Sequence, residues 1–182
     1  MLLTEGFDDA FYGHDYFIPT WQMSASKNVP NKYNVPDGWS VDANHYVYEL
    51  PGYIRVGLDN KETGAGSITT PALTALGDIP ADITLTFKIG IHMGGSASYA
   101  PDPTTLTVTA EGAGTAAEPV HELASLPAEC KPATEAEAKA MEDAYYKWYP
   151  VTVKVTGATK DTKITIGGTG RHYIDDIVIT KD

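Results

Sequence analysis

Two adjacent carboxylates, Asp175 and Asp176, are the residues in this chain best placed to do chemistry. They stand inside the segment 171–180, which otherwise has the apolar, β-branched composition of a buried strand. A carboxylate in apolar surroundings loses its hydration, so the fold must supply a cation or hydrogen bonds in return. The segment 2–9 near the other end of the chain is a second short strand followed by acidic residues. We therefore expect the first and last strands to lie together at these carboxylates.

Side chains alternate between the two faces of a β-strand, so adjacent residues cannot point into the same site. Strict alternation predicts that Asp175 faces the core and Asp176 faces outward. The residues expected on the core side with Asp175 are Tyr173, Ile177 and Ile179, and those expected on the outer side are Ile174 and Val178. An alternative role for Asp175 is to accept backbone N–H groups or to pair with Arg55 or Arg171.

The residue types used in catalysis are present, but no pattern brings them together. The five histidines show no His-x-x-x-His spacing, and no Gly-x-Ser-x-Gly occurs. Glycoside hydrolysis would need two converging carboxylates, and nothing singles out such a pair. The single cysteine, Cys130, excludes an intramolecular disulfide and a cysteine-based zinc site. We expect a protein that is not an enzyme and has no catalytic residues.

Aromatic side chains provide the strongest indication of a binding surface. Sugar rings present apolar C–H faces that stack on flat aromatic rings in a concave, partly apolar site. The candidate ligand-binding residues are Trp21, Trp39, Tyr46, Tyr48 and Trp148. Trp39 and Trp148 have an alternative role, which is to plug the ends of a hydrophobic core.

The charge of the chain excludes some partners. Its 13 basic and 24 acidic residues give a net charge of −11. Nucleic acids and anionic lipids need clustered Lys and Arg, so neither is an expected partner. No apolar run approaches the roughly 20 residues of a membrane-spanning helix, and the first residues do not resemble a signal peptide.

Most of the sequence predicts short β-strands. The strongest pattern covers Ala81 to Met93, where five apolar residues recur at every second position and Thr84, Thr86 and Lys88 fall between them. About ten such strands without a βαβ rhythm favour an all-β fold, an antiparallel β-sandwich of the jelly-roll type, in a single domain over residues 1–182. One short inserted helix is expected near residues 134–146, with Thr134 and Glu137 in a capping box.

The chain resembles the galactose-binding-like jelly-roll modules of Bacteroidetes surface proteins, a group that includes cleaved-adhesin domains and carbohydrate-binding modules. The segments that carry the resemblance are Glu5-Gly6-Phe7-Asp8-Asp9, Gly52-Tyr53-Ile54-Arg55-Val56-Gly57, Ser67-Ile68-Thr69-Thr70-Pro71-Ala72-Leu73, the strand Ile83 to Ile91, Trp148 before a Val-rich strand, and Tyr173-Ile174-Asp175-Asp176-Ile177. The resemblance spans nearly the whole chain.

This resemblance implies a secreted or cell-surface module without catalytic activity. It also implies a structural calcium ion where the first strand meets the last, with Glu5, Asp8, Asp175 and Asp176 as candidate ligands, because calcium prefers hard oxygen donors. The function expected first is binding of a polysaccharide or another glycan. The alternative is a protein-interaction, adhesion or spacer module that binds no sugar.

Overall fold

A computed structural model of the chain describes residues 1–10, 34–42, 47–57, 66–91, 105–116, 120–122, 148–168 and 170–182. Within these ranges the chain forms β-strands and one 3₁₀ turn, η2 (Thr74–Leu76). The strands are β1 (Leu3–Glu5), β2 (Ser40–Val41), β3 (Val47–Leu50), β4 (Tyr53–Val56), β5 (Gly66–Thr69), β6 (Ala81–Ile91), β7 (Thr105–Glu111), β8 (Thr115–Ala116), β9 (Val120–Glu122), β10 (Tyr149–Ala158), β11 (Lys163–Gly168) and β12 (His172–Lys181). The helix expected near residues 134–146 lies outside the described residues.

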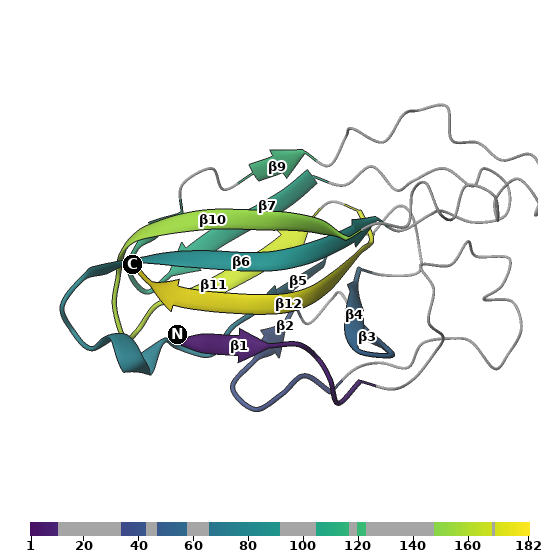
Figure 1. Ribbon diagram of the computed structural model, residues 1–182, viewed down its shortest axis with the longest axis horizontal. Helices are drawn as coiled ribbons and strands as arrows, with labels where there is room; N and C mark the ends of the chain where they lie inside the picture. The colour runs from purple at the N-terminus through teal and green to yellow at the C-terminus, as the bar shows by residue number, and fades with distance from the viewer. Residues whose placement is uncertain are drawn as a thin grey trace, which may run out of the picture.

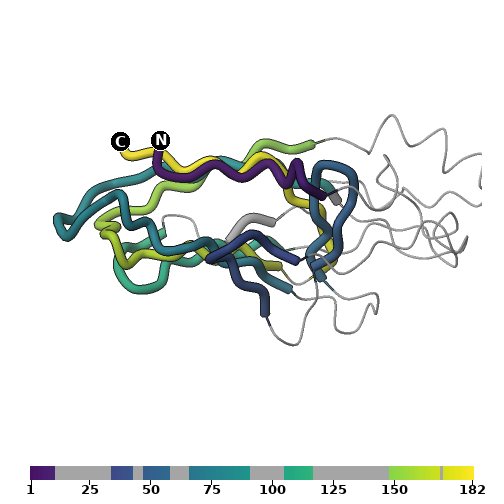
Figure 2. Tube along the Cα trace, turned by 90° about the horizontal axis from the view of Figure 1, so that it is seen from below, coloured from purple at the N-terminus to yellow at the C-terminus, as the bar shows by residue number. Residues whose placement is uncertain are grey.

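The strands form two antiparallel sheets packed face to face (Figures 1 and 2). The front sheet in Figure 1 has the order β3-β4-β12-β6-β10-β8, and β1 pairs with β12 beside this path. The back sheet has the order β2-β5-β11-β7-β9. From β4 to β8, and again from β10 to β12, the chain changes sheet at every strand. The prediction of an antiparallel jelly-roll sandwich is therefore confirmed.

The main core lies between the two sheets. On β6, the buried residues Ile83, Leu85, Phe87 and Ile89 alternate with outward-facing Thr84, Thr86 and Lys88, as the period of two predicts. On β10, the buried residues are Val151, Val153 and Val155. Full burial of such a side chain contributes about 1.5–3 kcal/mol. Because β6 lies between β12 and β10, this alternation fixes which face of the front sheet is turned outward.

The last strand departs from strict alternation. The register of β12 against β6 shifts between Asp175 and Val178, which marks a β-bulge. Asp176 has a φ of 50°, in the left-handed region. Before the bulge Ile174 faces the main core, whereas after it Ile177 and Ile179 do so. The prediction that Asp175 shares the core face with Tyr173, Ile177 and Ile179 is wrong, because the bulge reverses the alternation between Ile174 and Ile177.

The bulge coincides with a change of partner along one edge of β12. Residues His172 to Ile174 pair with β4, whereas Ile177 to Ile179 pair with β1. Asp175 and Asp176 fall between these two ladders. Two short strands, β4 and β1, therefore pair with this edge of β12 one after the other. Asp175 and Asp176 lie at the point where β1 takes the place of β4.

Candidate functional site

The first and last strands are paired, as expected, and their pairing brings Asp8 close to Asp176. β1 pairs with β12 so that Glu5 is the register partner of Ile177. A Cβ atom built on Gly6 would lie 3.4 Å from Oδ2 of Asp8 and 3.8 Å from Oδ1 of Asp176. We refer to Glu5, Asp8, Asp175 and Asp176 as the acidic clasp.

Three of the four carboxylates of the acidic clasp form a hydrogen bond or an ion pair. Oε1 of Glu5 accepts the backbone N–H of Phe7 at 2.8 Å, and Oδ1 of Asp175 accepts that of Asp176 at 2.7 Å. Asp176 forms an ion pair with Lys88 of β6. Burial raises the pKa of Asp175 to about 6 and also raises the pKa of Glu5. The hydrogen bond to the Asp176 amide corresponds to the alternative role of Asp175, a backbone acceptor.

The acidic clasp, as it is arranged, does not fit a calcium ion. Calcium binds six to eight oxygens, and carboxylates must converge to supply them. In the described ranges, no three His, Cys, Asp or Glu side chains come close enough to hold a metal ion. Backbone amides already engage Glu5 and Asp175, and an ammonium group engages Asp176. Calcium at this position remains a prediction from the resemblance.

A second apolar cluster covers the outer face of the front sheet, at the end formed by β3 and β4. Leu50, Tyr53 and Tyr173 are almost completely buried there, with Trp148 packed against them. The ring centroid of Tyr53 lies 5.4 Å from that of Trp148 and 5.6 Å from that of Tyr173, both in edge-to-face geometry. Such pairs add about 0.5–1.5 kcal/mol beyond the burial of their area. We call Leu50, Tyr53, Tyr173 and Trp148 the aromatic cluster.

Two of the predicted sugar-binding residues lie at this cluster. Tyr48 and Trp148 are both partly exposed, and Tyr48 stands beside Arg55 in the register of β3 and β4. Trp39 lies elsewhere: it packs against the main core, with its ring 6.1 Å from that of Phe7. Trp21 and Tyr46 lie outside the described residues. The structure therefore brings Tyr48 and Trp148 to one region and separates Trp39 from it.

Arg55 and Lys88 were not among the predicted site residues. The guanidinium carbon of Arg55 lies 4.4 Å above the ring of Tyr48, and Arg55 is only 1% exposed. The signal in the sequence was the run Tyr53-Ile54-Arg55-Val56, which has large side chains on both faces, as in strands covered on both sides. Lys88 was correctly placed on the outer face, but its partner depends on the bulge.

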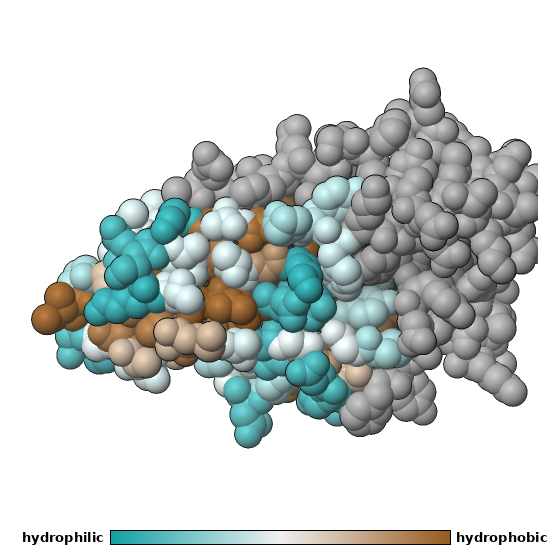
Figure 3. All heavy atoms as spheres, viewed as in Figure 1, coloured by the Kyte–Doolittle hydropathy of each residue, from teal (hydrophilic) through white to brown (hydrophobic). Residues whose placement is uncertain are grey.

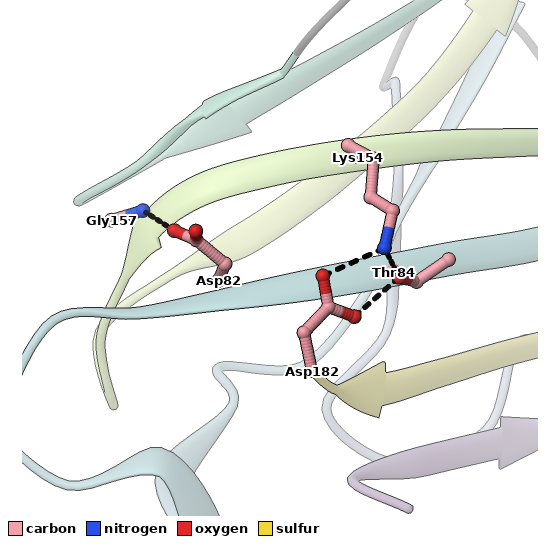
Figure 4. A network of polar contacts seen from close by, with 5 residues as sticks. All are labelled: Asp82, Thr84, Lys154, Gly157 and Asp182. Carbon is pink, nitrogen blue, oxygen red and sulfur yellow. Dashed lines mark hydrogen bonds and ion pairs between the residues drawn. The ribbon is translucent and has the colours of Figure 1, made fainter.

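A polar network lies at the opposite end of the same face (Figure 4). Lys154 of β10 donates to Thr84 at 2.6 Å and to Oδ2 of Asp182 at 2.7 Å. Thr84 donates to the other oxygen of Asp182, and Asp82 accepts the N–H of Gly157. These contacts are exposed and contribute little to stability. Figure 3 shows this face of the molecule, on which hydrophilic and hydrophobic residues are interspersed.

The two sheets form a jelly-roll β-sandwich. The acidic clasp lies where β1 meets β12, and the aromatic cluster lies on the outer face of the front sheet. Known structures of similar shape include the K3 cleaved adhesin domain of Lys-gingipain from Porphyromonas gingivalis w83, with 18% identity, coverage of 84% of this chain and 97% of that chain, and a TM-score of 0.49. They also include the CBM22-1 xylan-binding domain of Xyn10C from Paenibacillus barcinonensis, with 9% identity, coverage of 94% and 97%, and a TM-score of 0.46.

A CBM4 structure is similar at 12% identity and a TM-score of 0.39, covering 85% of this chain and 93% of the other. All three are modules of the group that the sequence resembles. No protein-family model and no curated protein matches the chain. Identities this low assign no function, so the function must be argued from the residues of this chain.

Among the described residues, no helix has the length and the apolar character needed to span a bilayer.

Proposed function

We propose that this chain is a non-catalytic binding module that holds a glycan at the aromatic cluster. The observation that carries the proposal is the placement of Tyr48 and Trp148. Both side chains are partly exposed, both lie at one end of the front sheet, and Trp148 rests on buried aromatic residues. An aromatic ring fixed in this way offers a sugar a preorganised surface, and little side-chain entropy is lost on binding.

The charge of the chain favours an uncharged glycan. A net charge of −11 repels polyanions, and the carboxylates of the acidic clasp lie on the same sheet. Stacking on aromatic rings depends on the apolar faces of the sugar and requires no charge. We therefore favour a neutral polysaccharide as the ligand, and we place the module outside the cell or at its surface.

Affinity electrophoresis against neutral plant, host and bacterial polysaccharides tests this proposal. Trp148→Ala and Tyr48→Ala should each weaken retention about tenfold, because each removes a stacking ring. Trp148→Phe and Tyr48→Phe are matched controls that keep a ring and should retain most of the binding. Thermal melting of every variant establishes that the sandwich is intact. An absence of binding across all the glycans, or alanine variants that bind as tightly as the parent, would refute the proposal.

One observation favours the alternative of a protein-interaction or spacer module. Leu50, Tyr53 and Tyr173 are at most 7% exposed, so a ligand reaches the rims of the cluster and not its centre. A module of this kind would capture a protein partner that binds equally well to the Trp148→Phe variant and in the presence of excess soluble glycan.

A further inference from the structure

We propose that Lys88, through its ion pair with Asp176, offsets the negative charge of the acidic clasp, so that the first and last strands pair there without a metal ion. The resemblance implies calcium at this position, and the arrangement of the residues does not fit it. The inference concerns the closure of the fold and is independent of glycan binding.

The position of Lys88 is fixed by β6, a central strand of the front sheet. Lys88 lies on β6 between Phe87 and Ile89, which are anchored in the main core. Its register partner on β12 is Asp175, and its ammonium group is paired with Asp176. The central strand β6 therefore places one positive charge next to the bulge of β12.

The bulge allows the carboxylate of Asp176 to reach the ammonium group of Lys88. With regular pairing, Asp175 and Asp176 would point to opposite faces of the sheet. The positive φ of Asp176 and the extra residue turn its carboxylate to Lys88 on the outer face, close to Gly6 at the end of β1. The backbone of β12 is thus shaped to meet an ammonium group on the neighbouring strand.

The negative charges of the acidic clasp require a positive charge nearby. Strand pairing brings Asp8, which follows β1, close to Asp176 of β12, and Glu5 lies three residues before Asp8. Four carboxylates on adjacent strands repel one another, and the hydrogen bonds to the Phe7 and Asp176 amides offset this only in part. The ammonium group of Lys88 supplies the missing opposite charge.

Lys88 also opposes calcium binding. A divalent ion coordinated by Asp176 would have to displace the ammonium group of Lys88 from that carboxylate. An ammonium group that stayed in place would repel the incoming ion. Lys88 and calcium therefore exclude each other at this position.

Thermal melting of the full chain tests the inference. At low ionic strength, the melting temperature of the parent should be unchanged within error by millimolar CaCl₂ or by EDTA. Lys88→Met should melt about 3 °C lower, since the carboxylates are left uncompensated. Lys154→Met is the matched control: Lys154 is an outward-facing lysine on the neighbouring strand, in an ion pair as exposed as that of Lys88 but outside the acidic clasp, and its loss should lower melting by about 1 °C or less.

Two further measurements distinguish loss of the positive charge from loss of side-chain packing as the cause of the lower melting temperature of Lys88→Met. Molar NaCl should narrow the gap between Lys88→Met and the parent, because salt screens the repulsion. Asp176→Asn in the Lys88→Met background should recover stability. If calcium raises the melting temperature of the parent and EDTA lowers it, the clasp holds a metal and the inference is overturned. It is also overturned if Lys88→Met behaves like Lys154→Met.

Discussion

His172 is the most deeply buried titratable residue in the described part of β12. It is fully buried at the start of the strand, and a Cβ atom on Gly168 of the opposite sheet would lie 3.0 Å from its Cε1. Its Nδ1 lies 2.8 Å from the carbonyl oxygen of Gly170, which can only accept, so Nδ1 carries the proton. Burial lowers the pKa of His172 from 6.5 to about 4. His172 is therefore neutral at neutral pH.

This difference in pKa predicts a loss of stability in mild acid. Between pH 6.5 and about 4, the unfolded chain takes up a proton at His172 and the folded chain does not. The stabilising effect of the neutral histidine is complete above pH 6.5 and is lost as the pH falls toward 4. Over this window, the free energy of unfolding of the parent should fall by about 3 kcal/mol more than that of His172→Asn, as measured by urea denaturation.

Asp175 must be considered in the same experiment. Its pKa is raised from 3.8 to about 6, so its protonation favours the folded state as the pH falls through nearly the same window. Both proteins retain Asp175, so the difference between the two curves isolates His172. His172→Asn keeps an N–H that can donate to Gly170 and will be less stable at neutral pH. Parallel pH profiles for the two proteins would contradict the prediction.

At the scale of single residues, the sequence predicted that the strands carrying the carboxylates pair with each other. It did not predict the direction in which the carboxylate side chains point. Tyr48 and Trp148 both lie at the end of the front sheet formed by β3 and β4, and the binding of a ligand there stays a prediction. The burial of Arg55 and His172 was not predicted, because a polar residue in a strand is assigned to the outside unless its partners are known. Gly170, which contacts His172, and Tyr48, which contacts Arg55, are near in sequence, but the neighbouring strands that bury these residues come from distant parts of the chain.

At the scale of elements, strands with one buried face were predicted well. β6 from Ile83 to Ile89 and β10 from Val151 to Val155 alternate with a period of two because one face meets the core and the other is turned outward. β12 was assigned correctly as a strand, but its faces were not, because one bulged residue reverses the pattern. The available signal was the aspartate itself, since Asp tolerates the left-handed conformation better than most residues.

The bulge predicts how Asp176 responds to substitution. Asp176→Asn and Asp176→Val both remove the ion pair with Lys88, but they differ in backbone preference. Asn tolerates a φ of 50°, whereas a β-branched side chain is strained there. We expect the Val variant to be about 1–2 kcal/mol less stable than the Asn variant in urea denaturation. Equal stabilities would show that the left-handed conformation is not maintained in solution.

At the scale of the whole molecule, the pattern of strands predicted the class of fold but not the order of strands in each sheet. Every pairing in the front sheet other than β3 with β4 joins strands that are not consecutive along the chain. Apart from the acidic residues that predicted the pairing of β1 with β12, such contacts leave no local trace in the sequence. One result is that the N-terminus and the C-terminus lie side by side at the end of the molecule opposite β3 and β4 (Figures 1 and 2).

Adjacent termini predict that the chain tolerates circular permutation. A flexible linker of about six residues should join Asp182 to Met1 without strain. New ends between Asp78 and Ile79 would interrupt an exposed loop, since Ile79 is 80% exposed. This permutant should unfold cooperatively, with a melting temperature within about 5 °C of the parent. A second permutant, opened between Phe87 and Lys88, should fail to fold because it cuts the central strand. Failure of both would show that the order of the chain is needed for folding.

The antiparallel pairing of β1 with β12 also determines how the molecule responds to mechanical force. Leu2 and Ile179 are hydrogen-bonded near the two chain ends, and the ladder runs inward from there to Glu5. Tension applied between the ends pulls directly on the first bond of this ladder, so the bonds break one after another, as in a zipper, and are not loaded together in shear. Under tension β1 should therefore peel away at low force as far as the bulge of β12, where Asp8 lies near Asp176.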